Sequence, residues 1–243
     1  MFCQKKNFDI INSLTYFIAE NAKDCRAFLK QCVYPEISWA ELSLINQHSN
    51  KDELLSYLQP LLKGQNMGLM SDAGCPGIAD PGADVIKLAH QKGIKVVPLV
   101  GPSSIVLSIM ASGFNGQNFA FVGYLPIEKL EKAKRIKELE QLCIKNKQAQ
   151  FFIETPYRNG SVFEELLKTL QPTTQLLVAT HITLDDECIE VKPISAWKKV
   201  SPPNFSKKPT VFGIYFWFFQ HILFLLIFWS PMFYGGFKLS LNV

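Results

Sequence analysis

Residues 71–82 of the chain read SDAGCPGIADPG, a loop whose residue types suit the binding of a small ligand. Three glycines, two prolines and two aspartates lie in this loop, between a strand-like run and a helix-like run. Glycines let backbone N–H groups approach a ligand closely, and prolines restrict the loop so that binding costs less entropy. The start of the following helix could receive a carboxylate or phosphate. We interpret the loop as a ligand site, with a rigid strand-to-helix connection as the alternative.

The spacing of the glycines and of the cysteines excludes several common sites. No Gly-Lys-Ser or Gly-Lys-Thr is present in the loop, so it is not a P-loop, and Gly74, Gly77 and Gly82 do not fit the GxGxxG dinucleotide pattern. The six cysteines, at positions 3, 25, 32, 75, 143 and 188, show neither CxxC nor zinc-ligand spacing. We therefore expect free thiols in a reducing compartment and no metal site.

A second loop of similar composition, Gly-Pro-Ser-Ser at 101–104, follows the strand-like run at 94–99. Ser103 or Ser104 could cap the helix that the sequence predicts next, which is the plain structural interpretation of the two serines. If the predicted strands at 67–71 and 94–99 are neighbours, both loops line the same edge of a sheet. Ligands of α/β proteins bind at such an edge, beyond the carboxyl ends of the strands.

A third segment, Glu-Thr-Pro-Tyr-Arg at 154–158, ends another predicted strand with a carboxylate, a hydroxyl, a ring and a guanidinium group. Glu154 could act as a base or bind a ribose hydroxyl, and Arg158 could hold a phosphate group. The alternative is a surface ion pair between these two side chains.

Strand and helix patterns alternate along the chain, and this alternation predicts α/β layers. Strands are predicted at 15–20, 67–71, 94–99, 119–122, 149–154, 175–180, 187–191 and 210–215. Helices are predicted at 23–31, 53–62, 83–91, 103–111, 128–145 and 160–170. The run Gly-Tyr-Leu-Pro at 123–126 is typical of a linker. We therefore predict two α/β domains, at 1–123 and 124–215, with a cleft between them.

The composition sets few limits on partners, but the C-terminal region is distinct. A length of 243 residues fits one large domain or two small ones, and a net charge of +4 neither requires nor excludes a nucleic-acid partner. No apolar signal-peptide core follows Met1, and we expect a cytoplasmic protein. Residues 214–229 are almost entirely apolar, slightly short of the about 20 residues of a membrane span unless the run extends to 233. We treat 216–243 as a hydrophobic tail.

Five motifs occur in a fixed order along the chain. They are SDAGCPGIADPG at 71–82, GPSS at 101–104, GYLP at 123–126, ETPYR at 154–158 and KPT at 208–210. Together they resemble the tetrapyrrole methylase superfamily of S-adenosylmethionine (SAM)-dependent enzymes, over about residues 8–215. The most similar branch is the RsmI-like type, which methylates a ribose 2′-hydroxyl of small-subunit ribosomal RNA. The resemblance implies two α/β domains with SAM in the cleft between them, ribosomal RNA or the small ribosomal subunit as partner, and a homodimer.

The resemblance also implies roles for individual residues. Contacts with SAM are implied for Ser71, Asp72, Ala73, Gly74, Ile78, Leu125, Thr155, Pro209 and Thr210. Ser103, Ser104 and Arg158 are implied on the side of the substrate. Glu154 is the candidate base for removing the proton of a ribose hydroxyl. No metal ion is needed for this chemistry.

Three features depart from the pattern of the family. Cys75 stands where the RNA-methylating members usually carry Thr, and residues 180–187 (THITLDDE) replace a run of the Arg-Glu-Leu-Thr-Lys type. The family usually begins with a strand and a loop before the helix that lies here at about 8–14, and this chain has only residues 1–6 in that place. Loss of that strand predicts an unpaired sheet edge and exposed apolar surface.

Several alternatives stay open from the sequence. A disrupted gene or an alternative reading frame would explain both the short beginning and the apolar tail, whereas a membrane anchor through 214–233 would explain the tail alone. The substrate could instead be a small molecule, tetrapyrrole-like or unknown. The chain could also be an inactive SAM-binding remnant or a membrane-tethered binding protein.

Overall fold

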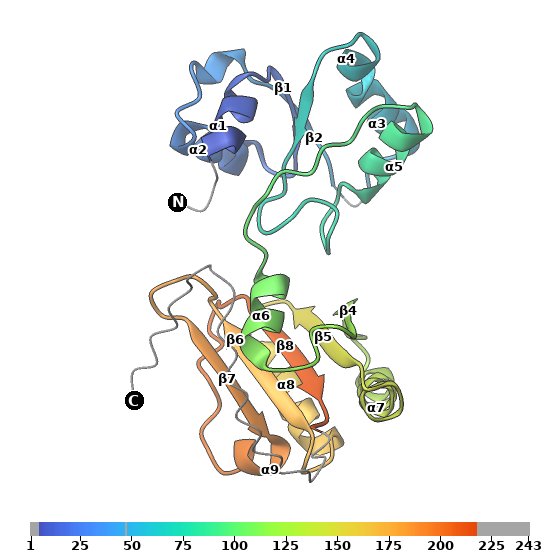
Figure 1. Cartoon of the computed structure of the whole chain (residues 1–243), viewed down its shortest axis with the longest axis vertical. Coiled ribbons are helices and arrows are strands. Elements are labelled where there is room, and N and C mark those ends of the chain that lie inside the picture. Colours follow the sequence, from blue (N-terminus) through green and yellow to red (C-terminus); the bar gives the residue numbers. More distant parts are fainter. Residues whose placement is uncertain (1–4, 47, 218–243) are drawn as a thin grey trace, which may run out of the picture.

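The computed structural model describes residues 5–46 and 48–217. Within these residues the chain forms two α/β parts, each built around its own sheet (Figure 1). The first part contains the residues coloured blue to green up to α5, and the second runs from α6, which is also green, to the red end of the described chain. The two-part α/β architecture predicted from the sequence is therefore confirmed.

The first sheet is parallel and has the strand order β2-β1-β3 within the described residues. Its strands are β1 (Tyr16–Ala19), β2 (Glu41–Leu44) and β3 (Met67–Leu69). The helices of this part are α1 (Lys5–Asn12), α2 (Ala22–Gln31), η1 (Ile37–Trp39), α3 (Lys51–Tyr57), α4 (Gln59–Leu62) and α5 (Ala83–Gln91). Because neighbouring strands are parallel, the loops that follow β1 and β3 leave the sheet at the same edge.

The second sheet has the strand order β4-β5-β8-β6-β7, with β4 and β5 parallel and the other pairs antiparallel. Its strands are β4 (Phe119–Tyr124), β5 (Ala149–Glu154), β6 (Gln175–Thr180), β7 (Cys188–Pro193) and β8 (Thr210–Tyr215). The helices of this part are α6 (Ser104–Ser112), α7 (Lys129–Asn146), α8 (Asn159–Thr169) and α9 (Ile194–Trp197).

Both faces of the central strands of this sheet are buried, which explains their nearly continuous apolar sequences. Phe152 packs into a cluster with side chains of α7, α8 and α9, whereas its neighbour Phe151 packs on the other face with Phe114, which follows α6. The alternation follows from the two-residue period of a strand. The sheet thus holds the end of β5, where Glu154 lies, between two layers of packed side chains.

The structure differs from the boundary predicted between residues 123 and 124. β4 continues to Tyr124 and pairs with β5, and α6 packs against β7 and β8, so residues 104–124 join the second sheet. The pairing register shifts between Phe121 and Tyr124, and Gly123 has φ 71°. The glycine that is typical of a linker therefore marks an irregularity inside a strand, a common position for glycine.

The strand predicted at 94–99 is wrong, since the structure assigns no strand to these residues. Val97 and Val100 are exposed, and the segment runs from α5 to α6 between the two parts (Figure 1). β3 pairs only with β1 within the described residues, so it lies at one side of the sheet. The apolar run at 94–99 does not pair with β3, although β3 has a free side, so its β-forming residues alone do not place it in the sheet.

The apolar tail predicted at 216–243 lies outside the described residues from position 218 onward. No helix in the described part of the chain has the length and apolar character of a membrane span.

Candidate functional site

The loop at 71–82 follows β3 and depends on glycine at three positions. Gly74, Gly77 and Gly82 have φ values of 80°, 78° and 125°, in a region that favours glycine. A Cβ atom at Gly82 would lie 3.2 Å from Cδ2 of Leu69. Most side chains from Ser71 to Gly74 are exposed or half-buried, so the loop presents accessible backbone at the edge of the sheet. Ile78 is also exposed.

The second loop contacts the first, although it does not follow a strand. Sγ of Cys75 lies 3.7 Å from the carbonyl oxygen of Pro102. Ser103 caps α6, because its hydroxyl accepts from the N–H of Val106 at 3.4 Å. The predicted cap is confirmed, and Ser104 is the first residue of the helix. The predicted reason for the proximity of the loops was wrong, but the loops do meet.

Glu154 is held in place by three donors at the end of β5. Its Oε1 accepts from the N–H of Thr155 at 2.8 Å, the hydroxyl of Thr155 at 3.3 Å and Nη2 of Arg158 at 2.6 Å. The Glu154 side chain is 0% exposed and that of Arg158 is 21% exposed. The ion pair is therefore not a surface pair, since its carboxylate is fully buried.

The other oxygen of this carboxylate, Oε2 of Glu154, is buried and has no hydrogen-bond partner among the described residues. An unsatisfied buried acceptor costs about 1–3 kcal/mol, more for a charged group, and such atoms are rare in native proteins. A second such atom, Oδ1 of Asn159, lies nearby in the fold. The Nδ2 of Asn159 donates to Oγ1 of Thr210 at 3.0 Å, and Thr210 is the partner of Glu154 in the β5–β8 ladder. The two oxygens identify a place where a ligand with N–H or O–H groups could bind.

Tyr124 connects the two halves of the site. Burial, followed by the carboxylates of Asp80 and Glu154, raises the pKa of Tyr124, and Arg158 partly opposes this effect. Asp80 belongs to the loop after β3, whereas Glu154 ends β5. Both carboxylates therefore act on one phenol, and the two predicted motifs lie in one electrostatic environment.

Sequence analysis missed Glu20, which lies directly after β1 at the same edge of the sheet. The N–H of Asp72 donates to Oε1 of Glu20 at 3.4 Å. Burial, followed by the nearby carboxylate of Asp80, raises the pKa of Glu20. Asp72 has two opposite effects on this pKa, since its N–H lowers it through the hydrogen bond and its negative charge raises it. The available signal was a carboxylate at the end of the run at 15–20, the same arrangement that drew attention to Glu154.

The remaining predicted residues differ in how accessible they are to a ligand. Thr155 is half-buried beside Glu154, and Pro209 lies next to Thr210 at the start of β8. Leu125 is buried in the core with side chains of α7 and α8, so only its backbone could face a ligand. The contacts of all these residues with a cofactor or a substrate stay predictions.

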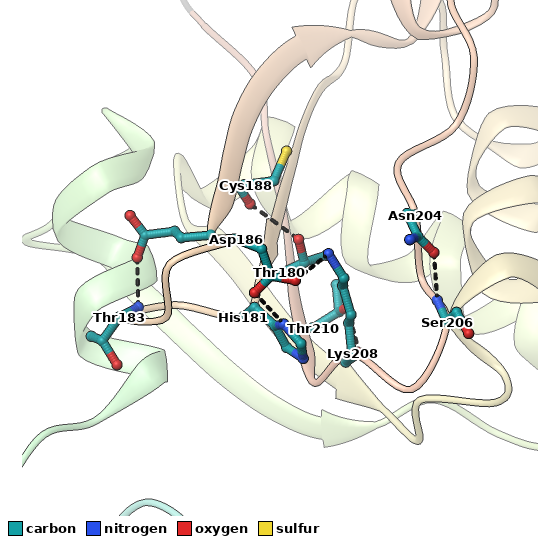
Figure 2. A network of polar contacts seen from close by, with 10 residues as sticks. Thr180, His181, Thr183, Asp186, Cys188, Asn204, Ser206, Lys208 and Thr210 are labelled. Atoms are coloured by element: carbon teal, nitrogen blue, oxygen red, sulfur yellow. Dashed lines mark hydrogen bonds and ion pairs between the residues drawn. The ribbon is translucent and has the colours of Figure 1, made fainter.

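The segment that departs from the family pattern, 180–187, is tied to the start of β8 by a charged network. Figure 2 shows Asp186 joined to His181 and Lys208, with 2.7 Å from Oδ1 to Nδ1 of His181 and 2.8 Å from Oδ2 to Nζ of Lys208. The hydrogen bond to Lys208, followed by that to His181, lowers the pKa of Asp186 to about 2. The network holds this loop against the residues that precede Thr210.

We expect this network to contribute stability that is lost in acid. The pKa of Asp186 is lower in the folded state than the about 3.9 of an unfolded aspartate, so its contribution is present above that value and disappears as the pH falls to about 2. Replacing Asp186 with Asn should lower the melting temperature at neutral pH and make the fall in acid shallower. The neighbouring exposed Asp185→Asn is the control. Equal acid profiles for the wild type and Asp186→Asn would contradict the assignment.

No family model matches the chain. Solved structures nevertheless show its fold. The methyltransferase CobJ aligns with a TM-score of 0.58 and 15% identity, with 88% of each chain covered. The cobalamin biosynthetic enzyme cobalt precorrin-4 methyltransferase CbiF aligns with a TM-score of 0.56 and 13% identity, with 87% of this chain and 88% of that chain covered. The fold is therefore that of these two methyltransferases.

Within this fold, the chain is similar in sequence to proteins named ribosomal RNA small subunit methyltransferase I. It is 30% identical to the one from Vibrio cholerae over 194 residues, which are 79% of this chain and 64% of that protein. It is 29% identical to the one from Leptospira biflexa over 178 residues, covering 72% and 69%, and 33% identical to the one from Bacillus subtilis over 182 residues, covering 74% and 58%. The resemblance that the five motifs indicate is confirmed. The aligned residues therefore cover less than two thirds of the length of the Vibrio cholerae protein.

Proposed function

We propose that the chain is a SAM-dependent methyltransferase whose substrate is a ribose 2′-hydroxyl of small-subunit ribosomal RNA. The similarity to proteins named ribosomal RNA small subunit methyltransferase I carries the choice of substrate. The buried, unpartnered Oε2 of Glu154 supports a bound cofactor.

The residues at the site fit SAM. SAM offers N–H and O–H donors on its amino acid, ribose and adenine groups, which could satisfy Oε2 of Glu154 and Oδ1 of Asn159. The glycine loop from Ser71 to Gly74 offers backbone donors and acceptors for its methionine part. SAM also carries a sulfonium cation, and the nearby carboxylates of Asp72 and Asp80 favour a positive charge. Thr155, Pro209 and Thr210 would lie along the side of the nucleoside.

When bound, SAM supplies an electrophilic methyl group. The contribution of the chain is then to position the acceptor oxygen in line with that group and to exclude water. The glycine loop and the end of β5 are held by rigid elements, since Glu154 has three donors and Gly82 packs against Leu69. Rigid surroundings favour such positioning because little ordering is needed when the substrate arrives.

The substrate side of the site has groups that suit RNA. The ring of Tyr157 is 82% exposed and the guanidinium carbon of Arg158 lies 5.8 Å from its centroid. Exposed rings stack on unpaired bases, and guanidinium groups bind phosphates. Ser103 and Ser104 follow Pro102, whose carbonyl oxygen contacts Cys75 of the glycine loop, and we place them on the substrate side as well. A methylase of a small molecule is the second candidate, because the solved structure CbiF is described as a cobalamin biosynthetic enzyme.

We also propose a homodimer that works in the cytoplasm, where its ribosomal substrate would be found. Exposed apolar side chains support an interface between copies, since contiguous apolar surface is often an interaction site. They are Val106 and Met110 on α6, Ile127 between β4 and α7, and Leu130 in the first turn of α7. A membrane contact through residues 214–233 falls mostly outside the described residues.

The proposal is tested in two steps with the full chain. Calorimetric titration with SAM should give saturable binding, and a cooperatively folded protein without binding would refute the enzyme function. Incubation with labelled SAM and undermethylated small ribosomal subunits should then label a ribose of the RNA. If SAM binds and the RNA stays unlabelled, the small-molecule candidate takes its place.

A further inference from the structure

We propose that Glu20 is the catalytic base of this methyl transfer, and that Glu154 instead binds the cofactor. Glu20 would accept the proton of the substrate hydroxyl as its oxygen attacks the methyl group. The inference rests on the proposed function and assigns a role to a residue that the five motifs do not include.

The position of Glu20 follows from the pairing of β1 with β3. Ile18 pairs with Leu69, and the N–H of Met70 donates to the carbonyl oxygen of Ile18 at 2.9 Å. Two residues beyond Ile18, Oε1 of Glu20 accepts from the N–H of Asp72 at 3.4 Å. The carboxylate therefore lies at the base of the loop proposed to hold the methionine part of SAM, which carries the reactive methyl group.

Glu154 is poorly suited to take the proton. Its side chain is fully buried, and one of its oxygens already accepts from Thr155 and Arg158. A base must approach a substrate hydroxyl that enters from solvent. The buried, unpartnered Oε2 of Glu154 would instead accept a hydrogen bond from the bound cofactor. This oxygen marks the cofactor position independently of the carboxylates around Glu20.

Glu20 has the accessibility and the proton affinity that a base needs. Its side chain is half-buried, so the carboxylate stays within reach of a substrate at the mouth of the site. Burial and the carboxylates of Asp80 and Asp72 raise its pKa. A raised pKa strengthens a carboxylate as a proton acceptor, as long as the group remains ionised at the working pH.

The step balances without a further reactant. The hydroxyl oxygen forms a bond to the methyl carbon, the sulfur–methyl bond breaks, and its electron pair stays on sulfur as a neutral thioether. The hydroxyl proton passes to Glu20, which becomes a neutral carboxylic acid. A cation and an anion are thus converted into neutral groups.

The test compares two properties of Glu20→Gln in the full chain, namely SAM affinity by calorimetry and the single-turnover rate of methyl transfer to undermethylated small subunits. Loss of a general base lowers such a rate by about 10²- to 10⁴-fold, while SAM affinity should stay unchanged because the amide keeps the bond to Asp72. Glu41→Gln, an exposed carboxylate at the opposite edge of the same sheet, is the control and should transfer at the wild-type rate.

A wild-type rate for Glu20→Gln would overturn the inference, as would loss of SAM binding with no separate effect on transfer. If Glu20→Gln does not fold, Glu20→Ala serves in its place, and a wild-type rate for this variant, which carries no carboxylate, also refutes the role. If the wild-type chain transfers no methyl group to RNA, the proposed function itself is refuted. This result is obtained before any variant is compared, so it is distinguishable from a failure of the role of Glu20.

Discussion

Replacing Arg158 with alanine is expected to lower the free energy of unfolding by about 3–5 kcal/mol. The substitution leaves the carboxylate of Glu154 buried, with 0% of its side chain exposed and without its cation. Removing one partner of a buried ion pair costs more than the pair contributes, because the remaining charge stays desolvated. The change is measured by urea denaturation of the purified protein. SAM affinity should fall in the same variant, because the carboxylate that we propose to bind the cofactor loses its position.

A matched control exists on α7. Arg135 and Glu138 form an ion pair at 3.3 Å whose side chains are 38% and 47% exposed. Arg135→Ala should change stability by less than about 1 kcal/mol, because water already solvates both groups. Similar losses for Arg158→Ala and Arg135→Ala would show that the pair at the end of β5 is not buried in solution.

Replacing Gly82 with alanine is expected to weaken SAM binding by about tenfold or more, the equivalent of about 1.4 kcal/mol. Gly82 has φ 125°, a conformation nearly restricted to glycine, and its new Cβ would lie 3.2 Å from Cδ2 of Leu69. The loop must then shift at the point where it enters α5, and the backbone groups proposed to hold the methionine part of SAM shift with it. Calorimetry with SAM measures the effect.

The control for this variant is Gly64→Ala. Gly64 also has a positive φ, 81°, but nothing lies within 4 Å of the position of its Cβ. Its replacement should lower stability modestly and leave SAM affinity unchanged. If Gly82→Ala binds SAM as tightly as Gly64→Ala does, the loop at 71–82 is only a rigid connection and the cofactor lies elsewhere.

Local signals in the sequence predict much of this fold. Ser103 caps α6 as expected, because a hydroxyl at that position satisfies an N–H of the first turn. The helix after Gly82 also begins where the loop ends. The predicted linker at 123–126 and the predicted strand at 94–99 are wrong for the same reason. Whether a glycine or a valine lies in a strand depends on the segments that pack beside it. Gly123 lies inside a strand, and the valine-rich run at 94–99 stays outside a sheet, because only the neighbouring strands decide between these outcomes.

The sequence predicts the separate segments of the candidate site, but it does not predict which of their side chains lie close together. The loop at 71–82 and the segment at 154–158 are recognisable from residue types alone. The contact of Glu20 with Asp72 joins residues 52 positions apart, and the effects of Asp80 and Glu154 on Tyr124 join a loop of the first part with strands of the second. No local pattern encodes such distances, so the sequence indicates which residues carry chemistry but not which of them share a neighbourhood.

The burial of β5 and β8 on both faces limits how this protein could diversify. Phe151 and Phe152 fill opposite layers, and a Cβ atom on Gly213 would lie 2.9 Å from Cε1 of Phe151. Within these strands, therefore, only side chains of similar volume and shape can be accommodated. The positions outside this packing lie where the strands end, at the exposed Tyr157 after β5 and at Ser206 and Lys207 before β8. A lineage built on this scaffold would explore new substrates by altering these short segments, while its framework stays almost fixed.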